Sequence, residues 1–241
     1  AIVFILSLNI VFKFINHPNL DYFEYSTLTR LILIILTAAY LFSKFKMQKE
    51  FFFKNTLIYS VVCILLLSAS FYNYMDDYQS KSLTVYFAFS ILTGVFEELL
   101  FRVLFLFVIW ELLSFMSVFS KIIINSLVFG LVHLSNLFNE NIIEVTVFTQ
   151  VLFAFVIGIF LIALLFKTKN IIVPISIHAL INFYGRINDL NQTVVFTEYT
   201  YKNVLSTLLF IGIISAILLP LSQLLLKGEF KKWDQLKFKM N

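Results

Sequence analysis

The chain has 241 residues, of which 60% are hydrophobic and 13% are charged, and its formal net charge is +4. Soluble domains carry about 25% charged residues, so this chain has too few charges to cover the surface of a water-soluble protein. The composition therefore excludes a soluble fold and predicts an all-α, polytopic helical bundle integral to a membrane. The single cysteine, Cys63, excludes an intramolecular disulfide.

Apolar runs separated by brief linkers predict about eight transmembrane helices. We expect them at residues 1–16, 29–45, 55–74, 83–115, 119–138, 145–166, 171–185 and 203–226. The fourth is too long for a hydrocarbon layer about 30 Å thick, so it should tilt or break. The seventh begins near Pro174, a residue that the first turn of a helix accepts. We interpret residues 1–226 as one transmembrane domain, with its motifs within 83–185, and residues 227–241 as a basic cytoplasmic tail.

The positive charges of the linkers and tail are distributed unevenly. Twelve lysines fall on one side of the predicted spans, and four lysines and arginines fall on the other. Short loops rich in lysine and arginine stay inside, so both termini should be cytoplasmic. The tail KGEFKKWDQLKFKMN mixes lysine with aromatic residues, which is typical of an anchor at an anionic leaflet and not of nucleic-acid binding. Abundant Phe, Ile, Lys and Asn, whose codons are rich in A and T, indicate a bacterium with an AT-rich genome, and we expect the protein in its plasma membrane.

Three ionisable residues stand in the fourth predicted span, within the stretch EELLFR. A charged group at the bilayer centre costs about 2.5–3.5 kcal/mol or more, so these groups must face the protein interior or water. Glu98 and Arg102 are four residues apart and share a helix face, which favours an ion pair. Glu97 points about 100° away from Glu98. We therefore expect one carboxylate to be neutralised while its neighbour remains available.

A second polar position lies in the fifth predicted span, at His133. Phe129 and Asn125 precede His133 by one and two turns on the same face. Gly130 should let another helix approach this face closely. For Asn125 we expect a hydrogen bond between helices.

A third polar position lies in the seventh predicted span, where His178 and Asn182 are four residues apart and share a face. At a rise of 1.5 Å per residue, Glu97 lies about 20 Å from the outer end of its span. Counted from the cytoplasmic end, His133 lies about 20 Å and His178 about 10 Å into their spans. Within the error of the predicted helix ends, the three residues lie at overlapping depths. A glutamate, two histidines and an asparagine from three helices should therefore converge near the middle of the membrane, somewhat towards the cytoplasm.

Such a cluster allows more than one chemistry. A carboxylate and an imidazole can deprotonate a water molecule, while a second imidazole and an amide can donate hydrogen bonds to an oxyanion. Glu97, His133 and His178 are also residue types that bind zinc, and their spacing alone cannot decide, because they lie on three spans. A proton-coupled transporter would also place Glu and His in the membrane, but its inverted repeats are not evident.

Three ordered motifs resemble one known family. Glu97–Arg102 matches the motif EExxxR, Phe129–His133 matches FxxxH, and His178–Asn182 matches HxxxN/D. These motifs are similar to those of the CPBP family, which groups type II CAAX prenyl endopeptidases with bacteriocin-processing and bacteriocin-immunity (Abi) proteins. The motifs cover residues 97–182, and the helical pattern extends the resemblance over nearly the whole chain.

The resemblance implies an intramembrane endopeptidase that acts on peptide or protein substrates in or at the lipid bilayer, such as leader peptides, pheromones or bacteriocin-related peptides. It implies these roles: Glu97 and His133 activate water, His178 and Asn182 form the oxyanion site, and Glu98 and Arg102 support them. It favours catalysis without a cofactor, with zinc held by the two histidines and Glu97 as the alternative. A non-catalytic membrane protein that confers bacteriocin self-immunity is the alternative function.

Overall fold

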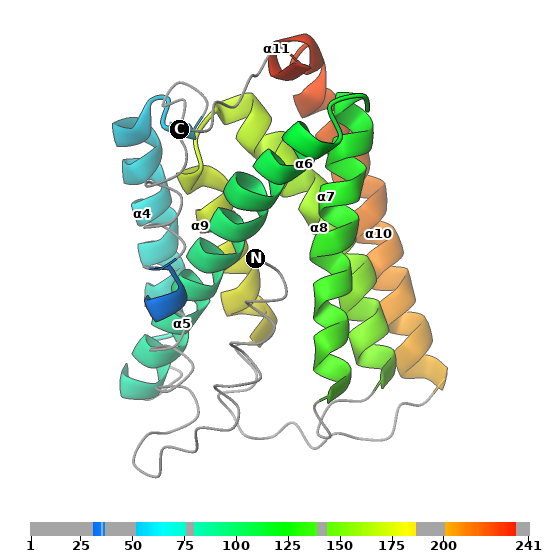
Figure 1. Cartoon of the computed structure of the whole chain (residues 1–241). Helices are drawn as coiled ribbons and strands as arrows, with labels where there is room; N and C mark the ends of the chain where they lie inside the picture. Colours follow the sequence, from blue (N-terminus) through cyan, green and yellow to red (C-terminus); the bar gives the residue numbers. More distant parts are fainter. Residues whose placement is uncertain are drawn as a thin grey trace.

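The computed structural model describes residues 31–34, 36, 52–75, 80–138, 144–186 and 201–234. Within these residues the chain is helical and has no β-strand; two residues, Phe53 and Asn170, form an isolated antiparallel bridge. The predicted all-α fold is confirmed for this part of the chain (Figure 1).

Ten helical segments follow one another in the described residues. They are α4 (Thr56–Tyr72), α5 (Ser80–Glu98), the π-helix η1 (Leu99–Phe105), α6 (Leu106–Leu112), α7 (Val118–Val132), the 3₁₀-helix η2 (His133–Phe138), α8 (Glu144–Thr168), α9 (Ile172–Arg186), α10 (Tyr201–Leu226) and α11 (Phe230–Asp234).

Six of the eight predicted helices appear close to their expected bounds. The helix expected at 83–115 is not one regular α-helix. It consists of α5, the π-helix η1 and α6 in succession. The helix expected at 1–16 lies outside the described residues, and so does most of the one expected at 29–45. The number of spans and the cytoplasmic placement of both termini therefore stay predictions.

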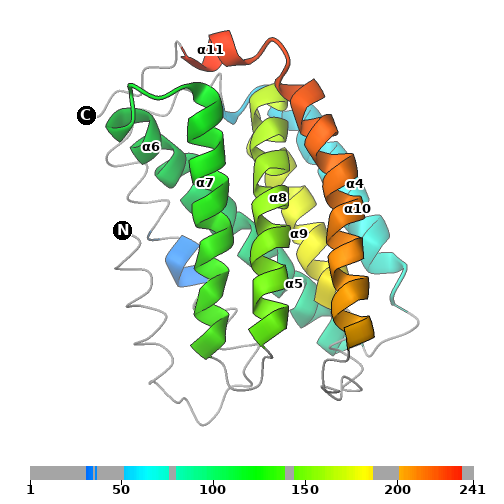
Figure 2. The same cartoon turned by 90° about the vertical axis from the view of Figure 1, so that its right-hand side faces the viewer.

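The helices pack in two groups. Figure 2 shows α7, α8 and α10 side by side, with α8 in contact with both of its neighbours. On the other side, α9 packs against α4 and α5, and it also contacts α8 (Figure 1). Helix α9 therefore joins the two groups, and it carries one of the predicted motifs into the interior.

The protein is a membrane protein. Within the described residues, three helices are long and apolar enough to cross a bilayer: Val118–Leu137, Val147–Thr168 and Val204–Leu226. Two shorter apolar helices accompany them, Thr56–Tyr72 and Ile172–Gly185. Helix α10 exposes large apolar side chains such as Leu209, Phe210 and Ile213. An apolar exposed face on a helix that satisfies its own backbone hydrogen bonds is suited to contact with lipid.

Local capping fixes where the motif helices begin. At the start of α7, Ser117 accepts a hydrogen bond from the backbone N–H of Ser120 at 3.2 Å. Before α9, the buried side chain of Asn170 accepts from the N–H of Ile172 at 2.9 Å and donates to the carbonyl of Lys54 at 2.8 Å. Such caps satisfy N–H groups that a helix leaves unpaired at its first turn. They also set the height of His133 and His178 in the bundle.

Two glycines permit close contacts between motif helices. A Cβ atom at Gly130 would lie 2.8 Å from the carbonyl oxygen of Val151 on α8, so any larger residue would force the helices apart. The predicted close approach at Gly130 is confirmed. At Gly94 on α5, a Cβ atom would lie 3.0 Å from the carbonyl oxygen of Ile175 and 3.1 Å from the nitrogen of Ala179 on α9. This second approach brings the EELLFR stretch against the helix that carries His178.

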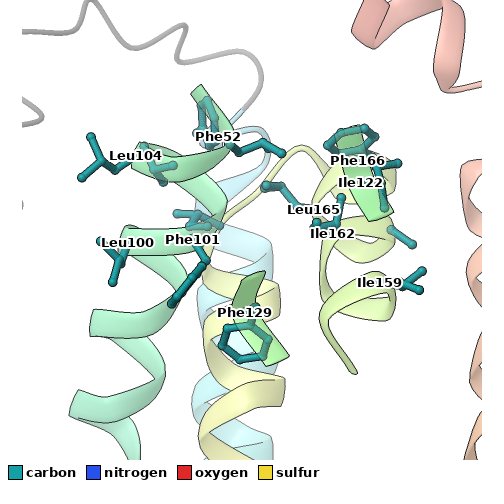
Figure 3. Packing of buried hydrophobic residues seen from close by; sticks show 14 of the residues in the cluster. Phe52, Leu100, Phe101, Leu104, Ile122, Phe129, Ile159, Ile162, Leu165 and Phe166 are labelled. Atoms are coloured by element: carbon teal, nitrogen blue, oxygen red, sulfur yellow. The ribbon is translucent and has the colours of Figure 1, made fainter. Parts of the chain in front are cut away.

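One end of the bundle is closed by aromatic residues from the tail. Trp233 of α11 is fully buried and stacks on Phe166 of α8, with ring centroids 3.7 Å apart. Its indole N–H donates to the carbonyl of Phe166 at 3.3 Å, and Trp110 donates to the carbonyl of Trp233 at 3.2 Å. Figure 3 shows Phe166 together with Phe52 at this end of the buried cluster. From its composition, the tail was predicted to be an anchor lying on the leaflet. At Trp233, however, the tail is part of the protein core.

This packing predicts a stability change. Trp233→Ala should destabilise the detergent-solubilised protein by about 3–5 kcal/mol, the range found when a large buried aromatic side chain is truncated. Phe230→Ala on the same short helix is the matched control, because Phe230 is 36% exposed and should change stability little. Thermal unfolding measures both variants. Equal melting temperatures would show that α11 does not stabilise the bundle.

Candidate active site

A buried ion pair lies at the end of α5. The Nε atom of Arg102 is 3.1 Å from Oε2 of Glu98, and both side chains are fully buried. The predicted pair is therefore confirmed. The two terminal guanidinium nitrogens of Arg102 have no hydrogen-bond partner among the described residues. The guanidinium carbon lies 4.3 Å from the ring centroid of Phe129, a cation–π contact that stabilises a desolvated cation.

The ion pair sits where the helix changes to π geometry. The N–H of Leu106, which ends this segment, donates to the carbonyl of Phe101, five residues earlier. The amide of Asn125 on α7 donates to the same carbonyl at 2.8 Å. The hydrogen bond between helices predicted for Asn125 is confirmed. A wider π turn rotates the residues that follow it relative to a regular helix, so Asn125 stabilises the rotation that buries Arg102.

His178 of α9 lies between the two glutamates. Its Nδ1 is hydrogen-bonded to Oε1 of Glu98 at 2.8 Å, and its Nε2 lies 3.4 Å from Oε2 of Glu97. The side chain of Glu98 is fully buried, whereas 23% of the Glu97 side chain is exposed. Glu97 is therefore the more exposed carboxylate of this cluster, and Glu98 is the one held in the buried ion pair, as the sequence indicated.

The hydrogen-bond geometry limits where protons can be. Glu98, with Arg102 beside it, accepts a hydrogen bond from the Nδ1–H group of His178. The nearby Nε2 atom and Glu97 can then share one further proton, which lies either on the imidazole or on the carboxyl. Both arrangements leave the four side chains with no net charge. A neutral cluster avoids most of the cost of placing isolated charges in a low-dielectric interior.

Phe129 of α7 lies at the centre of the site residues. Its ring is edge-on to His133 at 5.4 Å between centroids and edge-on to His178 at 5.7 Å. It also contacts Phe101 at 5.0 Å, and in Figure 3 it lies deep in the buried cluster beside α9. The sequence marked Phe129 as a motif residue on the His133 face. Its contacts with Arg102 and His178 depend on how three helices pack, which the sequence does not show.

His133 lies where α7 passes into the 3₁₀ segment η2. Its Nδ1 is 3.0 Å from the carbonyl oxygen of Phe129. A carbonyl only accepts, so Nδ1 of His133 donates this hydrogen bond and Nε2 is the ring nitrogen left to bond elsewhere. Among the described residues, the ion-pair partner of Glu97 is His178 and not His133. The joint activation of a water molecule by Glu97 and His133, which the resemblance implies, therefore stays a prediction.

Asn182 lies one turn beyond His178 on α9. Its Nδ2 atom is buried and has no hydrogen-bond partner among the described residues. The structure thus joins Glu97, Glu98, Arg102 and His178 by direct contacts. His133 is connected to these residues through the ring of Phe129. Asn182 has an unused donor on the same helix face as His178.

The side chains of the alternative zinc site, Glu97, His133 and His178, are not arranged as a set of metal ligands. Within the described residues, no group of three or more His, Cys, Asp or Glu side chains is arranged to hold a metal ion. The side chain of His178 faces two carboxylates, and Nδ1 of His133 faces a backbone carbonyl. The donor set of Glu97, His133 and His178 does not fit a metal in this arrangement, so we derive no chemical step through one.

The comparisons with known proteins agree with the motifs. Residues 79–184 match the family model described as Type II CAAX prenyl endopeptidase Rce1-like. No curated protein and no solved structure matches the chain significantly. The matched segment contains Glu97, Glu98, Arg102, His133, His178 and Asn182. The family is one of proteases, which supports a peptidase. The resemblance to the CPBP family is confirmed by this match of residues 79–184 to the type II CAAX prenyl endopeptidase Rce1-like family model.

Proposed function

We propose that the protein is an intramembrane endopeptidase that hydrolyses peptide bonds of membrane-associated peptides or proteins. The observation that carries this proposal is the pair of adjacent glutamates. Glu98 is fully buried between Arg102 and His178, while Glu97 is partly exposed beside the same imidazole. One carboxylate is fixed as a structural anion, and the other is left to exchange protons with water.

In the proposed reaction, His178 begins as the imidazolium and Glu97 as the carboxylate. Glu97 takes a proton from a water molecule while the water oxygen attacks the carbonyl carbon of the peptide bond. Nε2 of His133 accepts a hydrogen bond from the same water and orients it. The negative charge moves to the former carbonyl oxygen, which accepts hydrogen bonds from His178 and Asn182.

Collapse of the tetrahedral intermediate breaks the carbon–nitrogen bond. The proton held by Glu97 passes to the leaving nitrogen, and the products are a carboxylic acid and an amine. Throughout these steps the enzyme cluster and the bound substrate keep zero net charge, because each proton that leaves one group is taken up by another group of the cluster or the substrate. Glu98 and Arg102 do not take part in proton transfer; they hold the imidazole in place.

For the substrate class, we propose leader peptides, pheromones or bacteriocin-related peptides at the plasma membrane of a bacterium. A CAAX substrate requires a prenylated cysteine. For a bacterial host we therefore do not propose a CAAX protein as the substrate. The positive-inside pattern places both termini in the cytoplasm, so cleavage should occur towards the cytoplasmic side.

The first test of the proposal is the removal of the base. Glu97→Gln keeps the size of the side chain but cannot accept a proton, so cleavage should fall by about 10²–10⁴-fold, the usual contribution of a general base. The measurement is cleavage of a co-expressed candidate leader peptide that carries a fluorescence quencher pair. Glu111→Gln, on the exposed face of α6, is the matched control and should cleave as wild type does.

Cleavage by Glu97→Gln at the wild-type rate would refute the assigned chemistry. The same variant separates the enzyme from a bacteriocin self-immunity protein. Protection of cells against a bacteriocin that persists in Glu97→Gln would favour the non-catalytic function, whereas protection lost together with cleavage would favour the endopeptidase.

The second test concerns cofactors. Because the described acidic and histidine side chains do not form a metal-binding group, the purified enzyme should remain active after strong chelation. The assay compares cleavage before and after dialysis against a chelator, with a zinc-dependent protease treated in parallel as the control. Activity that disappears and returns on addition of zinc would show that the metal-dependent mechanism is correct.

A further inference from the structure

Thr93 of α5 has a buried hydroxyl group without a partner. The residue is 6% exposed, and its Oγ1 atom makes no hydrogen bond among the described residues. A hydroxyl removed from water normally finds a partner, since an unpaired one destabilises the folded state. A free, buried hydroxyl therefore indicates a site that is completed by something other than the protein chain.

Several other hydroxyls in these helices show the usual alternative, although the buried hydroxyl of Ser126 on α7 also has no partner among the described residues. Ser90, on the same helix, is fully buried and donates to the carbonyl of Tyr86, four residues earlier, at 2.9 Å. Ser70, Thr168 and Ser222 bond in the same way at 2.7–2.9 Å. Thr93 could turn to the carbonyl of Phe89 but does not. Its hydroxyl is instead free to bond elsewhere.

The packing of α5 on α9 shows where Thr93 lies. In Figure 1 the sequence colours of α5 and α9 advance in opposite directions, so the two helices are antiparallel. Glu97 and His178 meet across this interface at 3.4 Å. Thr93 is one turn before Glu97, and Asn182 is one turn after His178. In an antiparallel pair both steps lead in the same direction, so Thr93 and Asn182 occupy the next level of the same interface.

Both residues at this level have an unused donor. The Nδ2 atom of Asn182 and the Oγ1 atom of Thr93 are buried and have no hydrogen-bond partner in the described part of the chain. Gly94, next to Thr93, packs against Ile175 and Ala179 on α9, so the two backbones are close on the His178 side of this level. Two donors at one level, beside the general base, suit a single oxygen atom that needs two hydrogen bonds.

We propose that Thr93 is a further catalytic residue, which donates from its hydroxyl to the carbonyl oxygen of the scissile peptide bond together with Asn182. The inference rests on the endopeptidase function proposed above and extends it. The oxyanion site needs such a donor, because His178 can donate from Nε2 only as the imidazolium, where the nearby Glu97 carboxylate competes for the same proton. The hydroxyl of Thr93 has no such competitor among the described residues.

The test uses the full-length protein in liposomes with the quenched leader peptide as probe. Thr93→Val keeps the shape and removes the donor, so kcat should fall by about 10²-fold while KM stays within about threefold, as for the loss of one oxyanion donor. Thr93→Ser keeps the hydroxyl and should recover most of the lost rate. Ser90→Ala, which removes a bonded hydroxyl from the same helix, is the matched control and should leave kcat unchanged.

A double variant tests whether the two donors serve one oxygen. If they do, Thr93→Val combined with Asn182→Ala should lose less rate than the product of the two single losses. Melting temperatures in detergent monitor folding, and Thr93→Ala replaces Thr93→Val if the latter does not fold.

The outcomes separate the two proposals. Wild-type kcat in Thr93→Val, with Glu97→Gln inactive, would overturn the role of Thr93 alone. A loss of rate in Thr93→Val that Thr93→Ser does not recover would also overturn it, because the hydroxyl would not be the cause. No cleavage by wild type, or full cleavage by Glu97→Gln, would overturn the endopeptidase and this inference together.

Discussion

The position of Glu98 between Arg102 and His178 is the constraint on which the rest of the site depends. All three side chains are buried, and Glu98 contacts each partner through a different oxygen at 3.1 and 2.8 Å. A lone charge at this depth would be costly, and removal of one partner from a buried pair leaves the other uncompensated. The ion pair therefore fixes three groups at once: the guanidinium, the carboxylate and the imidazole that Glu97 also contacts.

The fold supports this constraint through close packing of small and flat groups. Gly94 lets α9 approach α5, and Gly130 lets α8 approach α7. The ring of Phe129 fills the space between the two histidines and covers the guanidinium of Arg102. Asn125 bonds the carbonyl of Phe101 within the π-helix. Each contact joins two different helices, so the site is held by the tertiary structure and not by one helix.

Much of this arrangement could be predicted from local patterns. Hydrophobic runs placed six helices close to their observed bounds, and the four-residue spacing of Glu98 and Arg102 predicted their ion pair. Predictions failed where tertiary packing decides the outcome. The composition of the tail indicated a surface anchor, but Trp233 is buried against Phe166. Hydrophobic periodicity does not reveal a π turn, because a single wider turn leaves the apolar pattern nearly intact.

The surroundings of Glu97 show what the sequence could and could not predict. The spacing showed that Glu97 points away from the ion pair, and the family resemblance implied that Glu97 and His133 activate water together, which stays a prediction. The direct contact of Glu97 is with His178. Helix α9 packs against Gly94 of α5, and this contact sets which face of α9 meets Glu97. The sequence pattern of a single helix does not show such a contact. The free donors of Thr93 and Asn182 follow from the same rotation, since neither residue could be paired before the two helix faces were matched.

Charge neutrality explains why two carboxylates can work side by side in this interior. Adjacent carboxylates repel each other in a low-dielectric medium unless cations balance them. Arg102 balances Glu98 permanently, whereas His178 balances Glu97 only while it holds a second proton. The charge of Glu97 is therefore tied to the protonation of its neighbour, and a proton can move between them without creating net charge. In the proposed mechanism, this coupling lets Glu97 take a proton from water at a depth where a carboxylate without a cation beside it would not remain ionised.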